Sequence, residues 1–100
     1  GEANYSDASW YACGYQQLGI GKMIGMPVPG TCSFAGWEQL QDGETRWGMV
    51  PVSSKVMNGQ WMENLEAVPD YVIKNEPSVI AAGRDQQLEK AVEVLLEQVK

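Results

Sequence analysis

A helix, a tight turn and a short strand follow one another between residues 7 and 27, and this order most constrains the fold. Apolar side chains recur at helical spacing from Asp7 to Leu18, and Gly19 follows as a helix stop. The run from Gly21 to Pro27 is short, apolar and bounded by glycines, as in a buried strand. A helix joined so closely to a strand predicts an α/β unit with a parallel or mixed sheet. We expect the helix to be buried on the side that carries Trp10, Tyr11, Gly14, Tyr15 and Leu18.

The middle of the chain has the pattern of β-hairpins. Residues 37–41 alternate, Asp42-Gly43 follows as a turn, and residues 46–50 predict the return strand, with Pro51 at its end or at a sheet edge. Asn58-Gly59 is the strongest hairpin signal and predicts a second hairpin between residues 53–57 and 60–64. Residues 71–73 indicate a brief strand, and residues 76–80 a turn or a single helical turn.

The last fifteen or so residues predict an amphipathic helix that begins at Asp85, a preferred N-cap residue. Its apolar stripe consists of Leu88, Ala91, Val92, Leu95, Leu96 and Val99. We expect this stripe to pack against the rest of the protein. The predicted fold is therefore mixed (α/β or α+β), with an N-terminal helix, short strands and hairpins, and a C-terminal packing helix.

Composition excludes several classes of function. With 100 residues the chain is long enough for one domain. Its net charge of −6 repels phosphate backbones, and no basic patch with interleaved aromatic residues is present, so we expect no nucleic-acid partner. No apolar run approaches the roughly 18 residues of a membrane span. Cys13 and Cys32 fit no metal spacing, and we interpret them as two buried free thiols, with one disulfide as the alternative.

The sequence contains no histidine. A Ser-His or Cys-His catalytic pair and a histidine-based metal site therefore cannot be assembled from these residues alone. We expect no metal and no other cofactor.

Ser6, in the run from Asn4 to Trp10, stands where a turn would meet the first helix. Unpaired N–H groups and the positive end of the helix dipole lie at such a point. The serine hydroxyl there is either an ordinary N-cap or a nucleophile with an oxyanion site beside it. The local sequence by itself favours the cap.

Two further places allow a structural and a functional interpretation. The segment from Pro27 to Thr31 cannot be regular structure, and it is either a connecting loop or a rigid wall beside the helix start. Glu63 follows Met62 at the end of an expected strand, where a half-buried carboxylate would be an orienting group. A structural ion network is the alternative for Glu63.

An ordered series of short motifs resembles the C-terminal part of the catalytic core of tricorn-like proteases, within the broader C-terminal processing protease family. The resemblance covers the chain from about Ala3 to Val99. It rests on residues 4–8 (NYSDA), 18–25 (LGIGKMIG), 29–31 (PGT), 62–64 (MEN), 68–70 (VPD) and 83–88 (GRDQQL).

This resemblance implies a serine peptidase with a Clp-protease/crotonase-like core. The family nucleophile falls on Ser6, one oxyanion donor on the Asp7 amide, and the glutamate of a Ser-His-Ser-Glu tetrad on Glu63. The loop that flanks the substrate cleft falls on Pro29, Gly30 and Thr31. The histidine, the second serine and a glycine amide of the oxyanion hole would lie upstream of this chain.

A second branch of the family uses a Ser-Lys dyad, whose lysine lies in the glycine-rich loop. The corresponding position here, near Thr31, has no lysine, and the nearest ones are Lys22 and Lys55. The absent loop lysine and the presence of Glu63 together favour the histidine-dependent branch.

We therefore expect residues 1–100 to be a fragment of a longer catalytic domain, inactive alone, that acts on peptides or proteins in the full protein. We also expect the fragment to need the upstream half of the domain and to form homo-oligomers. Relatives are either cytoplasmic or exported to the periplasm, so the compartment stays open. Two alternatives remain: a non-catalytic ligand- or lipid-binding module on the same fold, and an autonomous domain with a structural role.

Overall fold

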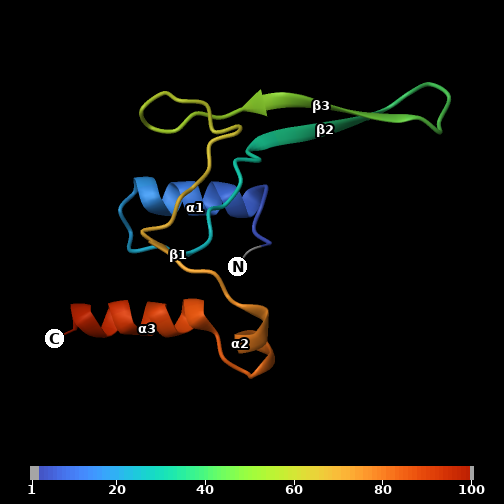
Figure 1. Cartoon of the computed structure of the whole chain (residues 1–100). Helices are drawn as coiled ribbons and strands as arrows, with labels where there is room; N and C mark the ends of the chain where they lie inside the picture. The colour runs from blue at the N-terminus through green and yellow to red at the C-terminus, as the bar shows by residue number, and fades with distance from the viewer. Residues whose placement is uncertain (1–2, 100) are drawn as a thin grey trace.

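The computed structural model describes residues 3–99, which form helices and strands in the order expected of a mixed α/β chain (Figure 1). The elements are α1 (Asp7–Gln17), β1 (Ile24–Gly25), β2 (Ser33–Gln39), β3 (Arg46–Ser53), β4 (Tyr71–Val72), α2 (Pro77–Ala81) and α3 (Gln86–Gln98).

Helix α1 ends as the sequence predicts but buries a different side. Gly19 has a φ of 62°, its amide donates to the Gln16 carbonyl at 3.1 Å, and the Ile20 amide donates to the Tyr15 carbonyl at 3.2 Å. This is a Schellman motif, which needs a left-handed residue at the glycine. The buried residues of α1 are Ser9, Ala12 and Cys13.

The expected apolar side of α1 was wrong, since the side chains of Tyr11 and Leu18 are 73% and 69% exposed. Trp10 is partly buried against the core. The residues of α1 that belong to the core cluster are the small ones, Ala12 and Cys13, and not the large apolar ones.

A short parallel pair follows the turn after α1. β1 pairs with β4 in the register Ile24↔Tyr71 and Gly25↔Val72. The carboxylate of Asp70 holds the start of this pair, because it accepts from the Met23 amide at 2.9 Å and pairs with the Lys22 ammonium at 2.7 Å. The parallel arrangement confirms the predicted α/β unit, although only two residues of the expected strand 21–27 are in the ladder.

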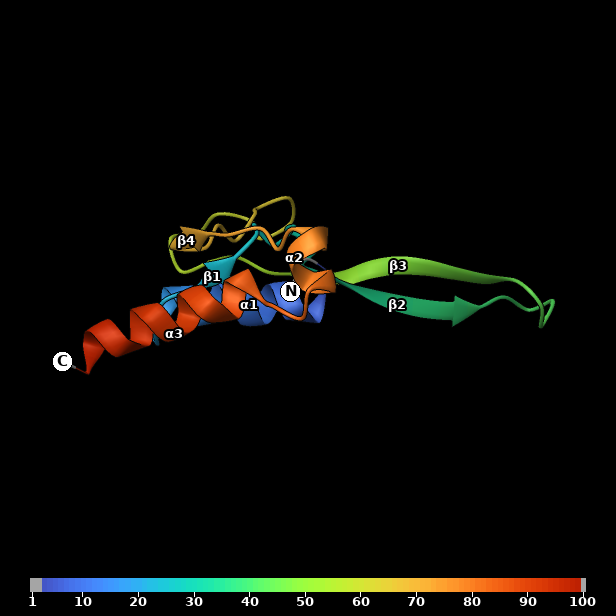
Figure 2. The same cartoon turned by 60° about the horizontal axis from the view of Figure 1, so that its bottom comes forward.

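The first predicted hairpin is confirmed and is longer than expected. β2 and β3 pair antiparallel from Ser33↔Ser53 to Gln39↔Arg46, with an irregularity between Phe34 and Gly36. β3 runs through Pro51, so the proline does not end the strand. Both views show the hairpin projecting from the helices (Figures 1 and 2), and every residue of β3 is exposed.

The second predicted hairpin is reduced to its turn. Gly59 has a φ of 87°, and its amide donates to the Val56 carbonyl at 2.8 Å, so the Asn58-Gly59 turn is formed. The flanking residues form only an isolated bridge between Lys55 and Trp61 instead of two strands.

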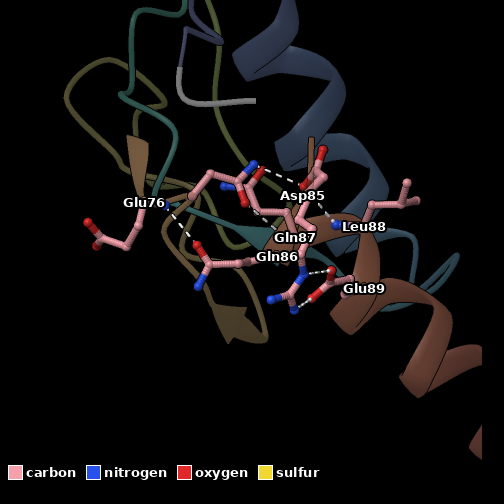
Figure 3. A network of polar contacts seen from close by, with 8 residues as sticks. Glu76, Asp85, Gln86, Gln87, Leu88 and Glu89 are labelled. Carbon is pink, nitrogen blue, oxygen red and sulfur yellow. Dashed lines mark hydrogen bonds and ion pairs between the residues drawn. The ribbon is translucent and has the colours of Figure 1, made fainter. Parts of the chain in front are cut away.

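Helix α3 has the predicted cap within a polar network that joins it to the preceding segment (Figure 3). Asp85 Oδ1 accepts from the Leu88 amide at 3.0 Å and from Asn75 Nδ2 at 2.9 Å. Gln87 donates from Nε2 to the Ile73 carbonyl at 2.9 Å. These bonds fix the beginning of α3 beside the chain that continues from β4.

The packing face of α3 was also predicted incorrectly. Val94 is the buried residue of this helix, whereas Leu88 and Val99 of the expected stripe are 62% and 79% exposed. α3 contacts β1. Helical periodicity shows that an apolar stripe exists, but it cannot show which neighbour the helix meets.

The core is small and lies between α1 and the loops that follow β1. It consists of Ala12, Cys13, Val28, Cys32, Met62 and Ala67. Both cysteines are buried free thiols, as predicted. The accessible surface is 7293 Å², against roughly 5,600 Å² for a compact monomer of this mass. The radius of gyration of 17.9 Å likewise exceeds the roughly 13 Å of a compact 100-residue domain.

Candidate functional site

Ser6 is exposed at the N-terminus of α1 in an unusual backbone conformation. Its φ is 55° and its ψ is −121°, a combination that costs a residue with a side chain about 1–3 kcal/mol. Its carbonyl accepts from the amides of Ser9 and Trp10, so the helix begins immediately after it. Within residues 3–99 its hydroxyl makes no capping hydrogen bond, so the interpretation of Ser6 as a side-chain cap is not supported.

The amide beside Ser6 is suited to an anion. Asp7 is the first residue of α1, and the first amides of a helix have no acceptor within it. The helix dipole adds positive potential at the same place. The Ser6 hydroxyl and the Asp7 amide are thus adjacent along the chain at a helix N-terminus.

The loop of Pro29, Gly30 and Thr31 is tied to α1 at two points. The Ser6 amide donates to Thr31 Oγ1 at 2.7 Å. The hydroxyl of Ser9, which is fully buried, donates to the Pro29 carbonyl at 2.7 Å. The Thr31 amide donates to the same carbonyl at 2.9 Å. The loop is therefore held against the start of α1 by two hydrogen bonds, one through the side chain of Thr31 and one through the side chain of Ser9.

Gly30 is required by the close approach of the opposite turn. A Cβ on Gly30 would lie 2.3 Å from the Leu65 amide nitrogen, which is main chain and cannot rotate away. The Asn64 amide donates to the Gly30 carbonyl at 2.7 Å, and Asn64 has a φ of 63°. Gly30 is buried between the two segments, while Pro29 and Thr31 are exposed on either side of it.

Glu63 lies in that opposite turn and is bound to the segment after Thr31. Its Oε2 accepts from the Cys32 amide at 3.1 Å and from the Ser33 hydroxyl at 2.5 Å. The residue is exposed rather than half-buried, and it follows an isolated bridge rather than a strand. The structure therefore connects Glu63 and Ser6 to neighbouring residues of one loop, residues 29–33.

The two lysines considered for a Ser-Lys dyad are engaged elsewhere. Lys22 forms its ion pair with Asp70, and this partner raises the pKa of the lysine, which opposes a role as a neutral base. Lys55 places its ammonium 4.3 Å from the centre of the Trp61 ring. Thr31, rather than a lysine, meets the Ser6 amide.

Two hollows accompany the site. One, of about 250 Å³, lies between α1 and β1 and includes Asn4, two residues before Ser6, in its lining. The other, of about 520 Å³, lies between the C-terminal part of α1 and residues 56–67, and its lining contains both polar and apolar side chains. Within residues 3–99, no group of three or more metal-ligating side chains is found, and none of the helices described there is long and apolar enough to span a membrane.

Sequence reasoning missed three residues that organise the site: Ser9, Ser33 and Asn64. Ser9 comes three residues after Ser6, but nothing local distinguishes its buried hydroxyl from a solvent-exposed one. Asn64 carried a usable signal, because asparagine tolerates the left-handed conformation better than most residues. The bond from Ser33 to Glu63 spans 30 residues and has no local signature.

Comparison with known proteins yields one informative likeness. No family model matches the chain, and no curated protein matches it. Among solved structures, the crystal structure of the tricorn protease matches with a TM-score of 0.85 and 23% sequence identity. The match covers 97% of this chain and 10% of that chain.

This likeness shows the fold. Nearly the whole chain follows the path of a segment of the tricorn protease and spans about a tenth of that protein's length. The resemblance to tricorn-like proteases is thereby confirmed at the level of the fold. Membership of the broader C-terminal processing family and a complete Clp-protease/crotonase-like core stay predictions, as do the roles of Ser6, Asp7, Glu63 and the loop from Pro29 to Thr31.

Proposed function

We propose that this chain carries the nucleophile of a serine peptidase, and that Ser6 is that nucleophile. The observation that carries the proposal is the backbone of Ser6, with a φ of 55° and a ψ of −121° at the start of α1. Strain of this kind persists only where the surroundings impose it, and it is concentrated at active sites. A sharp, strained turn into a helix also exposes the nucleophilic serine of unrelated hydrolases.

The reaction would proceed through an acyl-enzyme. Ser6 Oγ attacks the peptide carbonyl carbon while a histidine outside residues 1–100 takes its proton. The Asp7 amide, with an upstream glycine amide, holds the resulting oxyanion. The C–N bond then breaks as the histidine returns the proton to the leaving amine, and water hydrolyses the ester. The chain alone lacks the base and is expected to be inactive.

Glu63 would support the base through a second serine outside this chain. Both of its bonds within the described part of the chain reach Oε2. A carboxylate has about four lone-pair sites. The remaining oxygen, Oε1, therefore has capacity for a further donor such as that serine hydroxyl. Since Oε2 is anchored to residues 32–33, the carboxylate is also held in one orientation.

A fluorophosphonate probe tests the nucleophile in the longest natural protein that contains this chain. We expect labelling on Ser6 and its complete loss in Ser6→Ala. The matched control is Ser78→Ala, since Ser78 is likewise close to a helix N-terminus, that of α2, which begins at Pro77. Labelling that survives Ser6→Ala would refute the assignment, and loss in Ser78→Ala would show that the assay is not specific.

We further infer that residues 1–100 are the C-terminal portion of a catalytic domain whose other part, and further copies of the protein, cover exposed apolar surface. The surface exceeds that of a compact monomer by roughly 1,700 Å², and large contiguous apolar patches commonly mark interaction sites. On the hairpin, Trp37 is 71% exposed and Val50 is 53% exposed. Sedimentation velocity on the chain should show concentration-dependent association, and a strictly monomeric chain would contradict this inference.

The alternative of a ligand- or lipid-binding module receives less support. Small-molecule sites are mostly apolar hollows of about 300–1,000 Å³. The hollow between α1 and β1 is smaller, at about 250 Å³, whereas the larger one, at about 520 Å³, is within this range and has both polar and apolar side chains in its lining. The lining of neither hollow includes Ser6 or Glu63, so a binding module leaves the strained backbone of Ser6 unexplained, and the peptidase is the better interpretation.

A further inference from the structure

The conformation of Ser6 needs a support, and the structure contains one that is distant in sequence. A strained serine stays strained only if its neighbours over-determine it. The Ser6 amide donates to Thr31 Oγ1 at 2.7 Å, across 25 residues of chain. A bond to the amide of Ser6 acts directly on the peptide plane that sets its φ.

The hydroxyl of Thr31 is itself held in place. Its backbone amide donates to the Pro29 carbonyl, which also accepts from the buried Ser9 hydroxyl. Threonine is β-branched, so its side chain has few allowed orientations. The loop thus presents Oγ1 from a fixed backbone to the first residue before α1.

The other side of the same loop is equally constrained. The main chain of Leu65 lies directly against Gly30, and the Gly30 carbonyl accepts a hydrogen bond from the Asn64 amide. A movement of Thr31 away from Ser6 would therefore disturb the turn that carries Glu63. This continuity links the position of the Ser6 main chain to the position of the Glu63 carboxylate.

We propose that Thr31 is a positioning residue whose hydroxyl accepts the Ser6 N–H and thereby holds the strained turn that presents the Ser6 hydroxyl and the Asp7 amide. This inference rests on the proposed function of Ser6 and deepens it. It assigns Thr31 to the support of the nucleophile, whereas the sequence led us to expect this residue in the wall of a substrate cleft. Thr31 acts through Ser6 and contacts no reacting atom.

The test compares Thr31→Val, which keeps the shape and removes the hydroxyl, with Thr31→Ser, which keeps the hydroxyl. Both are made in the longest natural protein that contains the chain. In Thr31→Val we expect the rate of fluorophosphonate labelling and the kcat for a peptide substrate to fall about 10- to 100-fold, with KM within about twofold. Thr31→Ser should stay within about threefold of the wild type. The control is Thr45→Val, which removes a hydroxyl bound to Asp42 at the far hairpin turn.

Three results would overturn the inference: labelling of Thr31→Val at the wild-type rate, equal losses in Thr31→Val and Thr31→Ser, or a raised KM with unchanged kcat. The last would assign Thr31 to the substrate cleft. If Thr31→Val does not fold, Thr31→Ala carries the same expectation, because it also removes the hydroxyl. Hydrogen exchange of the Ser6 amide in the wild type gives a test without variants, because this amide should be protected, and full exposure would refute the bond.

These outcomes separate the two proposals. Survival of labelling in Ser6→Ala removes the nucleophile and the Thr31 inference with it. Loss of labelling in Ser6→Ala together with unchanged labelling in Thr31→Val removes the Thr31 inference alone.

Discussion

Replacing Gly30 with alanine tests how closely the loop from Pro29 to Thr31 is packed. The added Cβ would lie 2.3 Å from the Leu65 nitrogen and 2.5 Å from the Leu65 oxygen. Uncharged heavy atoms in ordinary contact are about 3.5 Å apart. One of the two main-chain segments must therefore move by roughly 1 Å, because neither can be relieved by a side-chain rotation.

The expected loss follows from that movement. Overpacking of this kind typically costs about 1–3 kcal/mol. A shift of the turn also lengthens the 2.7 Å bond from the Asn64 amide to the Gly30 carbonyl, and losing such a bond costs about 1 kcal/mol. We expect Gly30→Ala to lower the free energy of unfolding by about 2–4 kcal/mol.

Equilibrium urea unfolding followed by circular dichroism measures this change. Gly14→Ala is the matched control, since Gly14 is in the interior of α1 and a Cβ there would meet nothing within 4 Å. It should stabilise the protein by about 0.5–1 kcal/mol, because alanine favours the helix over glycine. The reasoning is refuted if Gly30→Ala unfolds within about 0.5 kcal/mol of the wild type, or if both substitutions act in the same direction.

Three further predictions concern the rest of the molecule. The hydrogen bond from Lys22 holds the pKa of Asp70 below its ordinary value, so this carboxylate stabilises the fold above about pH 4 and loses that contribution as the pH falls through its lowered pKa. The difference between the thermal melts of wild type and Asp70→Asn should be largest at pH 7 and should shrink as the pH falls below about 4. Asp85→Ala should lower the melting temperature and Asp85→Ser should lower it much less, because serine can still cap α3, and equal losses would contradict the cap. Burial raises the pKa of the Cys13 and Cys32 thiols. An aromatic disulfide reagent should therefore modify both thiols slowly in the native protein and rapidly in urea. Equal rates of modification in the two conditions would refute their burial.

The candidate site has features that the neighbouring residues in the sequence do not predict. Ser6 can be identified from sequence as a candidate, because a serine at a helix start is suited to a cap role and also to a catalytic role. The choice between them depends on its backbone angles, and these depend on Thr31, which is 25 residues away. In the same way, Glu63 attracts attention as a carboxylate beside Met62, but its partners at residues 32–33 are set by the fold.

The sequence by itself determined the features that act within a few residues. The stop at Gly19, the turns at Asp42-Gly43 and Asn58-Gly59, and the Asp85 cap were all predictable, since each depends on the conformational preference or hydrogen bonding of a residue and its close neighbours. Only the tertiary structure decided which faces of α1 and α3 are buried and that Ser6 is strained. The physical reason is that periodicity reports where apolar groups lie around a helix, whereas burial and strain depend on which distant segment comes into contact.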